Sequence, residues 1–123
     1  MNLSLLCSIF LGGGLGALSR FGLSHILSGL LGYALYISIL AVNLTGAALA
    51  GWLKGAYHLT HSSWQAFLMI GFLASFTTFS TFCAESLSLL EKRGALVAGA
   101  YILGTNILGL LAFYKAYKLA EGL

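Results

Sequence analysis

Five hydroxyl side chains crowd into seven consecutive positions of an otherwise apolar stretch. The stretch reads G-F-L-A-S-F-T-T-F-S-T-F at residues 71–82, and the hydroxyls belong to Ser75, Thr77, Thr78, Ser80 and Thr81. Hydroxyl side chains compete for nearby backbone groups, and β-branched residues weaken a helix. We therefore expect a local break in a helix here, the alternative being an intact helix whose hydroxyls bond back one turn. Carbonyl groups freed by a break can bind a cation.

Phenylalanine side chains alternate with these hydroxyls. Phe72, Phe76, Phe79 and Phe82 recur at helical spacing, a pattern that on its own is typical of packing against lipid or a core. Phenyl rings, however, have electropositive edges. Ring edges together with O–H donors can stabilise an anion without a formal positive charge that would trap it, as a permeation path requires.

Polar residues also interrupt two other apolar stretches. Asn43 lies in V-N-L-T-G and Asn106 in T-N-I-L-G. A buried amide must find hydrogen-bond partners, either on another helix or on a transported ion. Tyr101, Thr105 and Gly109 follow i, i+4, i+8 spacing, which places two hydroxyls on one helical face. Such a face suits a polar track through a membrane.

The composition indicates that these residues lie within a bilayer. Of the 123 residues, 59% are hydrophobic and 7% are charged, and the charges leave four long uncharged stretches. A helix that crosses about 30 Å of hydrocarbon needs about 20 apolar residues. We predict an all-α membrane protein with one domain over residues 1–123. Its four transmembrane helices should lie near residues 3–24, 34–53, 64–84 and 94–114, joined by connections of about ten residues, with the third helix broken near its middle.

Small residues four positions apart indicate where helices pack closely. The pairs are Gly12 and Gly16 in the first span, Gly46 and Ala50 with Ala47 and Gly51 in the second, and Ala95 and Gly99 with Ala100 and Gly104 in the fourth. Such spacing lets two backbones approach each other in lipid.

The basic residues favour neither orientation in the membrane. Four spans place both termini on one side. The basic residues of that side are Lys54, Lys115 and Lys118, and those of the opposite side are Arg20, Lys92 and Arg93. Orientation normally follows an excess of Lys and Arg in cytoplasmic loops. Equal numbers predict insertion in both orientations, unless subtler signals fix one, and two opposed copies can pair as an antiparallel homodimer about a two-fold axis.

The whole chain resembles the Fluc (CrcB) fluoride channels of microbial membranes. The resemblance rests on G-G-G-L-G-A-L-S-R at 12–20, V-N-L-T-G at 42–46, G-F-x-x-x-F-T-T-F-S-T-F-x-x-E at 71–85, and the T-N-I-L-G of the fourth span. It implies a dual-topology antiparallel homodimer with two pores in the cell membrane, the inner membrane of a bacterium. Those pores would conduct fluoride passively and selectively and so relieve fluoride toxicity in the cytoplasm.

The resemblance also implies roles for individual residues. Phe79 and Phe82 would form the aromatic pair along each pore, and the donors along the path would be Asn43, Ser80, Thr81, Tyr101 and Thr105. Arg20 would supply positive potential at the pore mouth, and Glu85 would lie near the end of the pore. The family holds a structural sodium ion at the dimer centre, bound by backbone carbonyls that match Ala74 and Thr77 of both chains. This chain has Ala74-Ser75 where the family usually has two glycines, and Gly109 where many relatives have serine.

Two other functions fit the sequence less well. A proton-coupled small multidrug exporter also has four spans and dual topology, but it needs a membrane-embedded acid. The first span has no Asp or Glu, and Glu85 ends the third. A structural subunit would leave the buried polar groups unexplained.

We do not expect the protein to be an enzyme, because no nucleophile–base pair or metal constellation appears in the sequence. The net charge of +3 is too small and dispersed to suggest nucleic acid as a partner.

Overall fold

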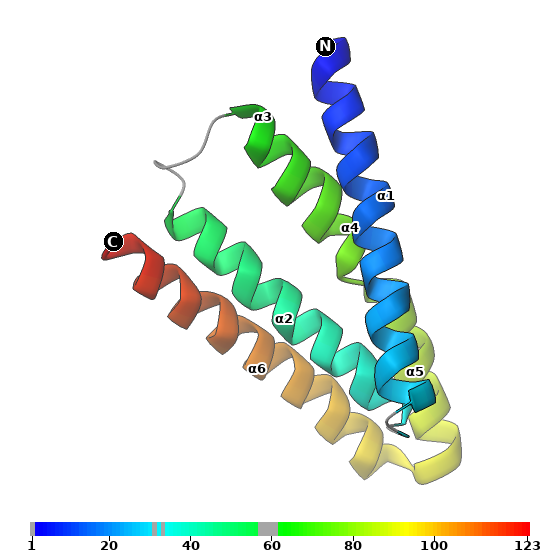
Figure 1. The fold of residues 1–123 in the computed structure, drawn as a ribbon. Coiled ribbons are helices and arrows are strands. Elements are labelled where there is room, and N and C mark those ends of the chain that lie inside the picture. The colour runs from blue at the N-terminus through cyan, green and yellow to red at the C-terminus, as the bar shows by residue number, and fades with distance from the viewer. Residues whose placement is uncertain (1, 31, 33, 57–61) are drawn as a thin grey trace.

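The computed structural model describes the whole chain except residues 1, 31, 33 and 57–61, and every regular element in that part is helical (Figure 1). Helix α1 (Leu3–His25) continues into the π-helical segment η1 (Ile26–Leu30), and α2 (Leu35–Gly55) follows. The next helical stretch consists of α3 (Ser62–Gln65), the π-helical segment η3 (Ala66–Leu73) and α4 (Ala74–Phe76). Helices α5 (Phe79–Arg93) and α6 (Ala95–Glu121) complete the fold.

Within the described residues, four helical stretches have the length and apolar composition needed to cross a membrane. They are Leu3–Leu30, Leu35–Gly55, Ser63–Arg93 and Ala95–Glu121. The expected all-α class with four apolar helices is thus confirmed. Each helical stretch ends later in the chain than predicted, at Leu30, Gly55, Arg93 and Glu121 instead of near residues 24, 53, 84 and 114. A charged residue marks the edge of the hydrocarbon, whereas a helix satisfies its own backbone hydrogen bonds and can continue into water.

The connection between the third and fourth spans is much shorter than expected. Instead of about ten residues, only Gly94 separates α5 from α6. Its φ angle of +87° lies in a region that residues with a Cβ rarely adopt. The polar residues between 85 and 93, which we expected in a loop, are helical.

Two consecutive threonines with extended backbone separate α4 from α5. Thr77 has a ψ angle of 152°, and Thr78 has φ and ψ of −143° and 116°. The Thr78 hydroxyl accepts a hydrogen bond from the backbone N–H of Thr81, so Thr78 is the N-cap of α5. The direction of α5 is therefore set at these two residues.

The helices pack in two main pairs, which meet at the end of the molecule that holds α5 (Figure 1). Helix α1 packs against η3 and α4, and α2 runs beside α6. A Cβ added at Gly12 or Gly16 would lie under 3.0 Å from the backbone of η3, and one at Gly51 would lie as close to Phe113 of α6. Glycine is needed at these positions because the two backbones approach too closely for a side chain.

The small residues of the fourth span behave differently. Nothing in the described part of the chain lies within 4 Å of a Cβ added at Gly99 or Gly104. The close packing that we expected at these positions is therefore not made within one chain.

Gly16→Ala is expected to lower the thermal midpoint of the purified protein in detergent. Its Cβ would collide with the Phe72 carbonyl, and overpacking of this kind costs about 1–3 kcal/mol. The matched control is Gly14→Ala on the same helix, where the added Cβ meets no atom within 4 Å. That variant should be as stable as the unmodified protein or slightly more so, because alanine favours a helix. Equal midpoints for the two variants would contradict the packing of α1 against η3.

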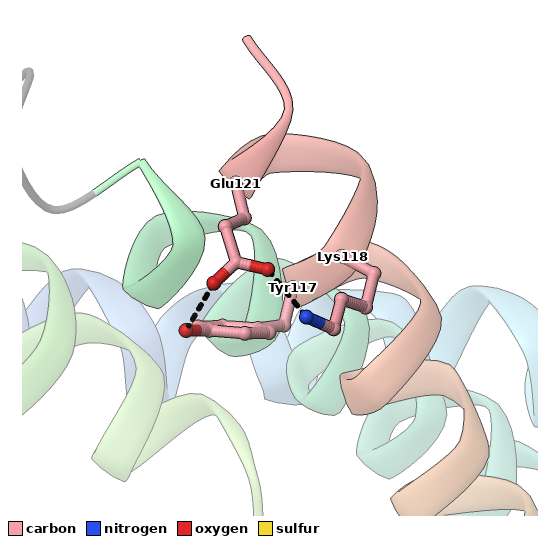
Figure 2. A network of polar contacts seen from close by, with 3 residues as sticks. All are labelled: Tyr117, Lys118 and Glu121. Carbon is pink, nitrogen blue, oxygen red and sulfur yellow. Dashed lines mark hydrogen bonds and ion pairs between the residues drawn. The ribbon is translucent and has the colours of Figure 1, made fainter.

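Polar side chains gather at the last turn of α6 (Figure 2). The Glu121 carboxylate accepts a hydrogen bond from the Tyr117 hydroxyl at 3.1 Å and forms an ion pair with the Lys118 ammonium at 2.6 Å. Gly55, at the end of α2, packs against the Tyr117 carbonyl. Lys54 and Lys118 consequently lie at the same end of the molecule.

Candidate functional site

An open groove of about 240 Å³ lies beside the two extended threonines. Side chains from α2, α5 and α6 and the extended segment line it, namely Asn43, Thr77, Thr78, Phe79, Phe82, Thr105 and Asn106. Four of these residues, Asn43, Phe79, Phe82 and Thr105, are among those expected along an anion path. Hydroxyl, amide and phenyl groups thus meet in one place from segments that are distant in the sequence.

The Asn43 side chain bridges α2 and the extended segment. Its Oδ1 accepts a hydrogen bond from the Thr78 backbone N–H at 2.9 Å, and its Nδ2 donates to the Thr78 carbonyl at 3.3 Å. Thr78 is 6% exposed, so these backbone groups would otherwise be desolvated without partners. The amide retains only one N–H that could reach an ion in the groove.

The Thr78 hydroxyl connects the other hydroxyls of the segment. Besides capping α5, it donates its one proton to the Thr81 hydroxyl at 3.0 Å and accepts from the Ser80 hydroxyl at 3.3 Å. Ser80 and Thr81, which we expected as donors along the path, therefore already share a partner. Our sequence reasoning missed the role of Thr78, although a hydroxyl residue just before a helix is a typical N-cap signal.

Four aromatic rings form a continuous row that starts at the groove. The Phe79 and Phe82 ring centroids are 5.8 Å apart, those of Phe82 and Tyr101 are 5.4 Å apart, and Tyr101 meets Tyr36 edge to face at 5.8 Å. Phe79 is 78% exposed, whereas Phe82 and Tyr101 are buried. The row leads from the middle of the third span toward the start of α2.

Two hydroxyls near this row are buried without a hydrogen-bond partner among the described residues. They are the Tyr101 hydroxyl and the Thr105 Oγ1, one helical turn apart on α6. A buried donor with no partner costs free energy, and native proteins rarely tolerate it without a water or ligand at the site. These two hydroxyls are consequently the strongest indication of an ion path beside the rings.

The two charged residues of the expected pore have different locations. Glu85 lies on α5, about one helical turn after Phe82 of the aromatic row. Arg20 lies on α1 and is not among the groove-lining residues of the described chain. One chain therefore brings Glu85, but not Arg20, to the aromatic row.

A second hollow, of about 340 Å³, shares Thr77 with the groove. Its lining residues are Gly46, Ala47, Ala50, Met69, Leu73, Ala74 and Thr77, with no acidic or basic side chain among them. In a continuous helix the Thr78 N–H would donate to the Ala74 carbonyl, but here it donates to Asn43. A carbonyl oxygen in a site without carboxylates suits a hard monovalent cation.

Four membrane-length helices with a groove of donors and phenyl rings at mid-span define an integral membrane protein of the kind that includes channels and transporters. The chain belongs to the CrcB family, described as "CrcB-like protein, Camphor Resistance (CrcB)", which matches residues 7–117.

Similar proteins come from several bacteria. A "Fluoride-specific ion channel FluC" from Aquifex aeolicus is 38% identical over 120 residues, covering 94% of this chain and 96% of the relative. A "Fluoride-specific ion channel FluC 2" from Bacillus thuringiensis is 37% identical, covering 88% of this chain and 90% of the relative. A "Fluoride-specific ion channel FluC" from Methylococcus capsulatus is 38% identical over all of this chain, which spans 55% of that longer relative.

Proposed function

We propose that the protein is a fluoride-selective ion channel, and not an enzyme, that exports cytoplasmic fluoride passively across a bacterial inner membrane. Membership of the CrcB family and the names of the relatives support this function. The structural observation that carries it is the pair of unpartnered hydroxyls, Tyr101 and Thr105, beside the phenyl rings.

Fluoride is small and holds its water tightly, so dehydration is the main barrier to its passage. Hydroxyl donors and positive ring edges can replace that water, while the absence of a formal charge in the groove lining lets the ion leave again. The proposed path enters at Phe79, passes Thr105, Phe82 and Tyr101, and ends near Glu85. Ser80, Thr81 and the remaining N–H of Asn43 add donors, and Arg20 supplies positive potential at the mouth.

Fluoride-sensitive bacteria that lack their own fluoride exporter provide a cellular test. Expression of this chain should restore growth at a fluoride concentration that otherwise stops it. Failure to grow, with the protein detected in the membrane fraction, would contradict the function. Resistance to a cationic dye without resistance to fluoride would instead favour a multidrug exporter.

The working unit in this proposal is an antiparallel homodimer. The groove is open, Phe79 at its edge is 78% exposed, and a Cβ added at Gly99 or Gly104 would meet nothing within 4 Å among the described residues. A second copy in the opposite orientation would cover such surfaces, and the three-to-three division of basic residues permits both orientations.

Two added positive charges should force one orientation. Replacing Gly122 and Leu123 by lysine places two cations next to Lys118, and we expect the chain to insert uniformly and fluoride resistance to fall. Co-expression with a variant biased the other way, such as Glu91→Lys, should restore resistance. A single orientation of the unmodified chain, measured by labelling a cysteine added at the C-terminus, would contradict dual topology.

A sodium ion at the dimer centre is the second element of this proposal. The Ala74 and Thr77 carbonyls of each chain would hold it, with Ala74 freed by the diversion of the Thr78 N–H. The site supplies oxygen ligands without a carboxylate, which favours a monovalent over a divalent cation because the divalent ion costs more to desolvate.

Sodium should therefore raise the thermal midpoint of the protein relative to N-methylglucamine at equal ionic strength. A ligand at 100 times its Kd stabilises the folded state by about 2.7 kcal/mol, which is readily detected. Equal midpoints in the two salts would indicate that Ala74-Ser75, in place of two glycines, has removed the site.

A further inference from the structure

The Asn43 side chain makes two hydrogen bonds to a single residue, Thr78, which is 35 positions away in the sequence. Its Oδ1 and one N–H of Nδ2 bind the backbone N–H and carbonyl of Thr78. A side-chain amide that pairs with both groups of one residue imitates the backbone pairing of a regular element. Thr78 belongs to no helix, and this pairing satisfies the backbone groups that its extended conformation leaves free.

The other amide at the groove is arranged differently. The Asn106 Nδ2 donates to the Ile102 carbonyl of its own helix at 2.7 Å, and its side chain is exposed. Both amides line the same groove, but only Asn43 joins two segments. The bridge from α2 to Thr78 is thus specific to Asn43 and is not a general property of asparagine at this depth.

Thr78 determines the geometry on both of its sides. Its hydroxyl caps α5, and the next residue, Phe79, begins the turn that carries Phe82. On the other side, the Thr78 N–H is withheld from the Ala74 carbonyl because Asn43 accepts it. Thr77, directly before it, lines both the groove and the second hollow. The group that holds Thr78 in place therefore has two effects. It orients the Phe79 and Phe82 rings, and it leaves the Ala74 carbonyl without its helical donor.

We infer that Asn43 is a positioning residue that holds the extended Thr77–Thr78 segment, and through it the first turn of α5, besides offering its remaining N–H to the path. The expected effect on transport rests on the proposed fluoride conduction. The effect on the backbone at Thr78 does not, because it can be measured without fluoride.

Exchange of the Thr78 amide proton, measured by NMR on the purified protein, tests the backbone part directly. In the unmodified protein this proton should exchange slowly although Thr78 is not helical. Asn43→Ala should speed its exchange at least about tenfold, because a hydrogen bond to a buried group is lost, and should lower fluoride release from liposomes by a similar factor. Asn43→Asp keeps the acceptor but loses the donor to the Thr78 carbonyl and adds a negative charge. It should keep much of the protection yet lose fluoride release.

Thr45→Ala is the matched control two residues along the same helix. Its exposed hydroxyl bonds only to the Ala41 carbonyl of α2, so both exchange and release should stay unchanged. Lost release in Asn43→Ala with unchanged exchange at Thr78 would overturn the inference in favour of a ligand role, and so would unchanged values of both. If Asn43→Ala does not fold, loss of protection in Asn43→Asp would overturn it. Absent fluoride release from the unmodified protein would count against the proposed function alone.

Discussion

Phe79→Ile and Phe82→Ile are each expected to lower fluoride release at least tenfold while the protein still folds. Isoleucine keeps the apolar character and much of the bulk but removes the electropositive ring edge. A hydrogen bond to a charged group contributes about 1.5–3 kcal/mol, and a ring-edge contact of the lower strength would suffice, because about 1.4 kcal/mol at the barrier is a tenfold change in rate. The two rings lie 5.8 Å apart at the groove, so either change leaves a gap in the row.

The two variants should differ in stability, which separates transport from packing. Buried Phe82 packs on Tyr101, whereas Phe79 is 78% exposed within one chain, so replacing Phe82 should lower the thermal midpoint more than replacing Phe79 does. Phe10→Ile on α1 is the matched control, because Phe10 is 80% exposed and does not line the groove. Normal fluoride release by both groove variants would mean that these rings only pack and that the proposed path is misplaced.

Tyr101→Phe is expected to lower fluoride release about tenfold or more without lowering the thermal midpoint. The Tyr101 hydroxyl is buried and has no partner in the part of the chain that the structure describes, so its removal leaves no described group unpaired and relieves a desolvation cost. An ion that relies on this donor, by contrast, loses it at the most dehydrated part of the path. Stability and transport should therefore respond in opposite directions, which is unusual for a buried polar group.

Thr105→Val extends this test to the second unpartnered hydroxyl. It should also lower fluoride release without lowering the thermal midpoint. Tyr114→Phe is the control, since Tyr114 is on the same helix but 58% exposed and lies beyond the groove. Release is measured on liposomes with equal protein content, and the midpoint by circular dichroism in detergent. A lower midpoint for Tyr101→Phe, with normal release, would show that the hydroxyl has a structural partner instead of an ion.

The membrane class could be predicted from the sequence because the length of the uncharged stretches decides it. Uncharged stretches long enough to cross the bilayer force the backbone into helices, and four such helices are found. The limits of the helices could not be predicted in this way. The Glu85 side chain marks the end of the apolar stretch, but the helix continues to Arg93 because polar residues are compatible with a helix outside the hydrocarbon.

The groove was only partly predictable. Their separation of four positions predicted that Tyr101 and Thr105 lie on one face of a helix, and among the described residues both of their hydroxyls are buried without a partner. Spacing within a segment cannot show contacts between segments, so the pairing of Asn43 with Thr78 had no local signal. For the same reason Phe79 and Phe82 could not be told apart from the sequence, although the Phe79 ring is exposed and the Phe82 ring is buried against Tyr101.

Fluoride release from liposomes that contain only this purified protein tests the central claim most directly. The liposomes hold fluoride or chloride inside, with no pH gradient, and release is followed with an ion-selective electrode after the membrane potential is removed. Our account predicts rapid release of fluoride, and release of chloride that stays near the rate of protein-free liposomes. Fluoride release no faster than from protein-free liposomes, or equal release of fluoride and chloride, would contradict it.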